Sequence, residues 1–162
     1  MTLDELNDLD PARAETEFRR CCGSASWARA MSEARPFGSL EAMIDTGDAC
    51  WAALAPQDWR EAFAAHPEIG EQKPVSAWSG EEQAGMASAA GAVRTRLAAL
   101  NAAYRSRFGY IFIVCATGKS PADMRVMLEA RLSNNPAIEL RIAAEEQRKI
   151  TGLRLAKLVG DA

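Results

Sequence analysis

The sequence predicts an all-α protein, a single-domain bundle of about eight helices with one buried extended segment. Helix start signals recur along the chain, and each precedes apolar residues at helical spacing. One stretch, Phe108–Cys115, has the run of aromatic and β-branched residues that is typical of a strand. It has no convincing partner, and a lone strand is not stable. The 162 residues suit one domain, so we expect a single domain over residues 1–162.

The first half of the chain shows a series of helix starts, each a capping residue or a proline at the first helical position. These starts lie at Thr2 with Glu5, Asp10–Pro11, Ser24, Ser39 and Pro56. Gly23 and the loop 35–38 separate helices here. His66–Pro67 ends the last of them, because the residue before a proline avoids helical backbone angles.

The second half begins with a break at residues 67–78, which show no periodicity. Such long loops in compact domains are often functional. Ser79 and Glu82 then form a capping box that predicts a long helix through Tyr104. Two later helices are expected to start at Ser120–Pro121 and Asn135–Pro136. Between them and the long helix lies Phe108–Cys115, which we interpret as a buried extended segment or an irregular helix start.

Composition and charge exclude several classes of function. The chain is 48% apolar and 25% charged, as in ordinary globular proteins, and no apolar run is long enough to cross a bilayer. A net charge of −3 argues against nucleic-acid binding. One histidine and four cysteines without a Cys-x-x-Cys pair predict no metal site. Neither terminus shows a targeting signal, so we expect a cytoplasmic protein.

His66 is the residue best suited to proton transfer near neutral pH, and it stands where the long loop starts. A histidine at a helix end is nevertheless often structural. Glu82 is explained by the capping box alone, although a helix N-terminus can also present amide donors to a polar ligand. Cys115 could pair with His66 as a thiol and base, but a buried structural thiol is the more frequent case.

Two further features bear on ligand binding. Gly118-Lys119-Ser120 follows an apolar run as in a phosphate-binding loop, but Ile113 stands where that motif needs glycine, so a turn and helix cap fit better. The extended segment has backbone N–H and C=O groups that need partners if no second strand supplies them. A polar heterocycle with alternating donors and acceptors could pair with some of these groups.

Taken together and in order, these pieces resemble the OHCU decarboxylase family, where OHCU is 2-oxo-4-hydroxy-4-carboxy-5-ureidoimidazoline. The resemblance covers nearly the whole chain. Its motifs are Phe18-x-x-Cys21-Cys22-Gly23-Ser24, Trp27-Ala28, Arg35-Pro36-Phe37, Asp58-Trp59, His66-Pro67-x-Ile69-Gly70, Ser79-x-x-Glu82-Gln83, Leu100-Asn101-x-x-Tyr104, Phe108-Gly109-Tyr110-x-Phe112-Ile113-Val114-Cys115-Ala116, Arg131-Leu132-x-Asn134, Glu139 and Lys149-Ile150-x-x-Leu153-Arg154-Leu155.

The resemblance implies an all-α homodimer that converts OHCU to (S)-allantoin in urate degradation without a cofactor. It implies that His66 is the catalytic acid or base and that Glu82 is its partner at the substrate. The implied substrate-binding residues are Pro67, Ser79, Gly80, Glu81, Glu82, Gln83, Phe112, Ile113, Val114, Cys115 and Ala116. Arg154 and Arg131 are candidates for the substrate carboxylate, which a guanidinium can bind in bidentate fashion.

Two other classes of function stay open at this point. A small hydrolase could use His66 with Cys115 or Ser79, and it would form a covalent intermediate that a decarboxylase does not form. A helical adaptor module would explain the amphipathic helices. It would not explain why the long loop starts at the only histidine.

Overall fold

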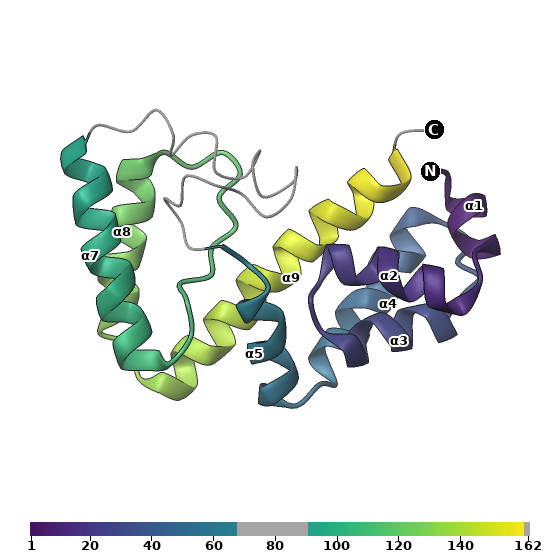
Figure 1. The fold of residues 1–162 in the computed structure, drawn as a ribbon, viewed down its shortest axis with the longest axis horizontal. Coiled ribbons are helices and arrows are strands. Elements are labelled where there is room, and N and C mark those ends of the chain that lie inside the picture. Colours follow the sequence, from purple (N-terminus) through teal and green to yellow (C-terminus); the bar gives the residue numbers. More distant parts are fainter. Residues whose placement is uncertain (68–90, 161–162) are drawn as a thin grey trace. The chain divides into compact units, whose positions relative to one another are not determined.

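The computed structural model describes residues 1–67 and 91–160, and all the secondary structure within these ranges is helical. The all-α fold class is therefore confirmed. The described helices are α1 (Leu3–Asp8), α2 (Pro11–Cys21), α3 (Ala25–Glu33), α4 (Leu40–Ala52), α5 (Pro56–Ala64), α7 (Gly91–Phe108), α8 (Pro121–Leu132) and α9 (Pro136–Gly160) (Figure 1). None of these helices combines the length and the apolar character that crossing a bilayer requires.

The helix starts predicted at Thr2, Asp10, Ser24 and Ser39 are confirmed by local capping hydrogen bonds, and α5 starts at Pro56 as predicted. Thr2 forms a capping box with Glu5 at the start of α1, and Asp10 accepts a hydrogen bond from the Arg13 amide at the start of α2. Ser24 and Ser39 cap α3 and α4 in the same way. Each cap pairs an amide that the helix itself leaves without a partner. The helix start predicted at Ser79 lies outside the described residues.

The chain divides into two compact units, one formed by residues 1–65 and 147–162 and the other by residues 66–146. Whether they act as one domain, as predicted for residues 1–162, stays a prediction.

In the first unit, the Trp27 ring packs edge-on against Phe18, with centroids 6.0 Å apart. Its Nε1 donates to the Gly47 carbonyl at 3.0 Å. A Cβ at Gly47 would lie 3.4 Å from the same ring, which is an ordinary van der Waals contact.

In the second unit, α7 and α8 pack side by side and run in the same direction (Figure 1). The connection between them, residues 109–120, therefore returns along the helix pair, and an extended backbone covers that path with few residues. Gly109 and Gly118 adopt positive φ at its two ends. The Lys119 amide donates to the Ala116 carbonyl and Ser120 caps α8, so Gly118-Lys119-Ser120 is a turn and helix cap.

Candidate active site

The segment Ile111–Ala116 is buried and has no regular secondary structure. Phe112 and Ile113 are each only 2% exposed. The predicted buried extended segment is therefore present, and its five predicted binding residues, Phe112–Ala116, lie next to one another along it. Since no strand pairs with it among the described residues, side chains have to supply hydrogen bonds to its backbone.

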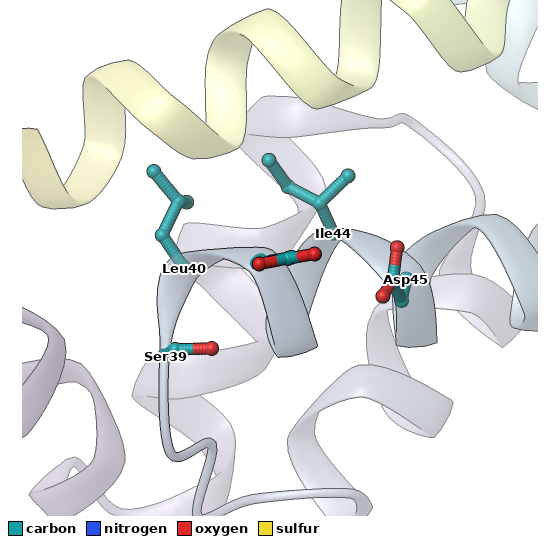
Figure 2. Close-up of a pocket in the computed structure, with 5 residues that line it drawn as sticks. Ser39, Leu40, Ile44 and Asp45 are labelled. Carbon is teal, nitrogen blue, oxygen red and sulfur yellow. The ribbon is translucent and has the colours of Figure 1, made fainter.

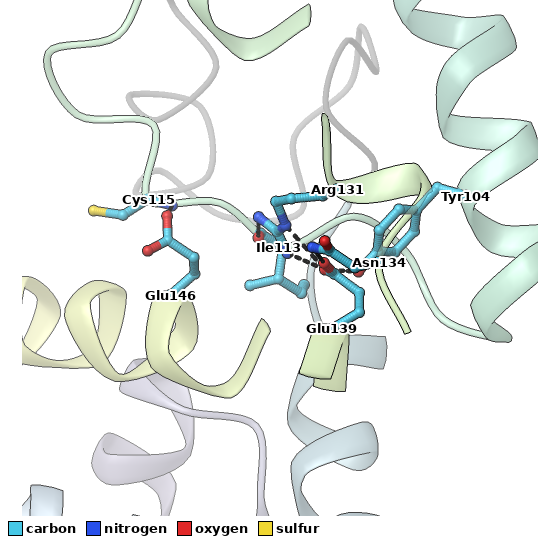
Figure 3. Close-up of polar contacts among 7 residues, drawn as sticks. All are labelled: Tyr104, Ile113, Cys115, Arg131, Asn134, Glu139 and Glu146. Atoms are coloured by element: carbon cyan, nitrogen blue, oxygen red, sulfur yellow. Dashed lines mark hydrogen bonds and ion pairs between the residues drawn. The ribbon is translucent and has the colours of Figure 1, made fainter. Parts of the chain in front are cut away.

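A buried ion pair between α8 and α9 supplies one of these bonds. Arg131 donates from Nη1 to the Ile113 carbonyl at 2.7 Å, and its Nη2 lies 2.6 Å from Oε2 of Glu139 (Figure 3). The Arg131 side chain is 8% exposed and the Glu139 side chain is fully buried. The guanidinium also lies over the Phe112 ring, with Cζ 4.4 Å from its centroid. Arg131 thus connects the extended segment to α9.

Glu139 gathers further donors around its carboxylate. Oε2 accepts from Nε of Arg131 at 2.9 Å and from the Tyr104 hydroxyl at 2.5 Å, while Oε1 accepts from Nδ2 of Asn134 at 3.1 Å (Figure 3). Burial and this hydrogen bond raise the pKa of the Tyr104 phenol, so the hydroxyl keeps its proton. The buried carboxylate is stabilised by several donors, as burial of a charge requires.

A second carboxylate of α9, Glu146, bonds the segment directly. Its Oε1 accepts from the Cys115 backbone amide at 3.1 Å (Figure 3). Nζ of Lys119 donates to the Cys115 carbonyl at 2.8 Å. Glu146 is 6% exposed. Both backbone groups of Cys115 are therefore paired, which leaves the orientation of this residue well defined.

His66 and Pro67 directly follow α5, and both are half-buried. The helix ends at Ala64 with Ala65 as its C-cap, so His66 stands beyond the helix end as the sequence predicted. The predicted site residues Ser79–Gln83, with Glu82 among them, lie outside the described residues. Whether His66 and Glu82 meet therefore stays a prediction.

Arg154 lies in the first unit, buried on the last part of α9. Burial raises the pKa of Cys21 to about 12 and that of Cys22 to about 11, and the positive charge of Arg154 opposes both shifts. The guanidinium is thus near these two thiols. The thiols themselves are protonated and buried, so they are poor nucleophiles.

A surface pocket of about 500 Å³ lies at the start of α4, and none of the predicted site residues lines it. Its lining consists of Ser39, Leu40, Glu41, Ile44 and Asp45. Leu40 and Ile44 are its apolar side chains (Figure 2). Two carboxylates and no basic side chain make this a poor site for a substrate that carries a carboxylate. The pocket is therefore not a candidate for the reaction that the resemblance implies.

Sequence reasoning missed the parts played by Glu139, Glu146 and Tyr104. One signal was available, because Glu139 and Glu146 are seven residues apart and so lie on the same face of a helix. That face also carries Ile142, Ala143 and Ile150, and a carboxylate on an apolar face calls for a buried partner. The sequence did not indicate which partner that would be.

Over the described residues, fold and site together define the class: an all-α protein in which buried carboxylates hold an extended segment in place. Comparison with known proteins then identifies the family. Residues 7–156 match the family model described as OHCU decarboxylase. The chain therefore belongs to the OHCU decarboxylase family, whose members are carboxy-lyases, and the predicted family is confirmed.

Individual relatives agree with this assignment. The chain is 40% identical to the uric acid degradation bifunctional protein TTL of Arabidopsis thaliana, over 91% of this chain and 48% of that protein. It thus spans about half the length of that bifunctional relative. It is 32% identical to the 2-oxo-4-hydroxy-4-carboxy-5-ureidoimidazoline decarboxylase of Bos taurus, with 99% of both chains covered.

A solved structure supports both fold and family. The structure of an OHCU decarboxylase in the presence of (S)-allantoin matches with a TM-score of 0.81 and 40% identity, covering 90% of this chain and 98% of that one. An (S)-allantoin synthase structure matches at a TM-score of 0.74 but only 20% identity, so it supports the fold alone.

Proposed function

We propose that this chain decarboxylates OHCU to (S)-allantoin in urate degradation, with His66 as the acid or base. The observation that carries the proposal is the family match over residues 7–156. It is supported by the 40% identity to a decarboxylase solved in the presence of (S)-allantoin. Glu82, Pro67 and Ser79–Gln83 complete the proposed substrate site, together with the Phe112–Ala116 segment.

The chemistry fits a protein without a cofactor. Loss of CO2 from OHCU leaves an electron pair, and the ring C=N beside the carbon that bears the carboxylate accepts it. The enediamine-like intermediate must then take up a proton on one face of the ureido carbon, while the hydroxyl-bearing carbon becomes a carbonyl. The protein therefore needs one proton-handling group, a rigid set of hydrogen-bonding groups and an anchor for the carboxylate.

Of the two arginines predicted as candidates for this anchor, Arg131 is already engaged within the protein. All three guanidinium nitrogens of Arg131 already donate, two to Glu139 and one to Ile113. Its charge is neutralised by a fully buried carboxylate. A substrate carboxylate would have to displace Glu139, which would then be buried without its cation. We therefore propose that Arg131 holds the binding segment, and that Arg154 is the candidate for the substrate carboxylate.

The proposal is tested by adding freshly prepared OHCU to the enzyme and measuring the optical activity of the allantoin formed. The enzyme should accelerate CO2 loss above the spontaneous rate and give one enantiomer, because only a bound intermediate is protonated on a single face. An enzyme-free reaction serves as control. Racemic allantoin formed at the spontaneous rate would contradict the proposed function.

The assembly and the location of the protein are also proposed. We infer a homodimer, which is the state expected from the family, and a cytoplasmic location. Analytical ultracentrifugation of the purified chain tests the first, and a mass of one chain across micromolar concentrations would argue against it. Fractionation of the cells that produce the protein tests the second.

A further inference from the structure

Two carboxylates on one face of α9 hold alternate residues of the extended segment. Glu139 acts through Arg131, whose Nη1 donates to the Ile113 carbonyl. Glu146 accepts directly from the Cys115 amide. The two carboxylates are two helical turns apart, so they face the segment at two points along its course.

These two contacts determine which way the backbone of Val114, the residue between Ile113 and Cys115, is oriented. In an extended backbone, the N–H and C=O of one residue point to one side and those of the next residue point to the other. Since Ile113 and Cys115 are bonded toward α8 and α9, the peptide groups of Val114 point the opposite way. No hydrogen bond joins the Val114 backbone to any other described residue. Its donor and acceptor therefore face away from the two helices.

We propose that Glu146 is a positioning residue, which fixes the backbone of Cys115 so that the N–H and C=O of Val114 face the substrate. The inference rests on the proposed function, in which this segment binds the substrate through main-chain groups. A rotation of the 114–115 region would turn these groups back toward the helices. The hydrogen bond from the Cys115 amide to Oε1 of Glu146 opposes that rotation, because a rotated amide would be buried without an acceptor.

Three variants separate this role from a merely structural one. Glu146→Leu removes the acceptor at similar volume, and Glu146→Gln keeps an oxygen acceptor without the charge. Glu145→Leu is the matched control, because Glu145 is the neighbouring glutamate and is exposed. For each variant we would measure the affinity for (S)-allantoin, KM and kcat with OHCU, and hydrogen exchange of a peptide that covers residues 111–117.

We expect Glu146→Leu to weaken allantoin binding and to raise KM about tenfold or more, the order of the cost of leaving one buried amide without an acceptor. kcat should change much less. Amide exchange in the 111–117 peptide should become faster in this variant. Glu146→Gln should retain near-wild-type affinity and exchange, and Glu145→Leu should match the wild type in every measurement.

The proposal is overturned if Glu146→Leu keeps wild-type affinity, or if it loses affinity without faster exchange of the segment. It is also overturned if Glu146→Gln fails as badly as Glu146→Leu, since the charge and not the acceptor would then matter. If the leucine variant does not fold, Glu146→Asp takes its place, because its carboxylate is one methylene short of the Cys115 amide. Failure of the proposed function would appear separately, as a wild-type protein that neither converts OHCU nor binds allantoin, and the exchange comparison would still test the contact of Glu146.

Discussion

Glu139 and Arg131 form a two-point contact in which Nε and Nη2 of the guanidinium both donate to Oε2 of the carboxylate, at 2.9 and 2.6 Å. Both side chains are buried. Because Arg131 also bonds the Ile113 carbonyl, the pair belongs to the support of the binding segment as well as to the core. Its removal should therefore affect both stability and ligand binding.

We expect Glu139→Leu and Arg131→Met to destabilise the fold by about 3–5 kcal/mol each, because each leaves an uncompensated buried charge or an unpaired set of donors. The double variant should cost less than the sum of the single variants, since neither charge is then left alone. Urea unfolding of the four proteins measures this. Arg96→Ala, which removes an exposed pair with Glu129, is the control and should cost less than about 1 kcal/mol. Additive effects of the two core substitutions would contradict the coupling.

Tyr104 should make the folded state sensitive to alkaline pH. Its pKa is raised in the folded protein, first by burial and then by the hydrogen bond to Glu139. Above about pH 10 the unfolded chain releases this proton while the folded chain retains it, so stability falls as the pH rises. We expect urea midpoints between pH 9 and 11 to fall more steeply for the wild type than for Tyr104→Phe. Equal slopes would show that Tyr104 does not contribute.

The thiol of Cys115 should matter for activity only through its volume. The residue bonds its surroundings through its backbone amide and carbonyl. Cys115→Ser should therefore keep most activity with OHCU. Cys115→Trp should abolish it, because the side chain is buried and a large ring cannot fit without displacing the segment. A folded but inactive serine variant would instead support a nucleophilic thiol and hence the hydrolase alternative.

His66→Asn tests the proposed acid or base. Asparagine keeps a similar size and some hydrogen bonding but cannot exchange protons near neutral pH. We expect turnover to fall by about 10²–10⁴, the usual contribution of one positioned proton-transfer group. The fold should survive, because His66 is half-buried and lies beyond the end of α5. Affinity for (S)-allantoin should change far less than turnover.

Melting temperature, product affinity and turnover should be measured on the same His66→Asn preparation. Wild-type activity should depend on one ionisation near pH 6–7, where histidines ordinarily titrate, and this dependence should be absent from the residual rate of the variant. Normal turnover, or a loss of activity that only follows unfolding, would end the assignment of His66.

The sequence by itself determined the helices, because their start signals are local. Thr2 and Glu5 are three residues apart, as are Ser120 and Asp123, and each pair closes its hydrogen bonds within one helical turn. The buried segment was also predictable, since Phe108–Cys115 is too apolar for a surface loop and has no second strand to pair with. The ordered motifs were enough to indicate the family.

The tertiary structure alone decided how that segment is held. From the sequence, the guanidinium of Arg131 could bind either a substrate carboxylate or a protein carboxylate. Only the structure showed that it forms an ion pair with Glu139 of α9. The bond from Cys115 to Glu146 joins residues 31 positions apart, so no local pattern could specify it. The physical reason is that a cap depends on neighbours along the chain. The partner of a buried charge depends instead on which elements come together when the chain folds.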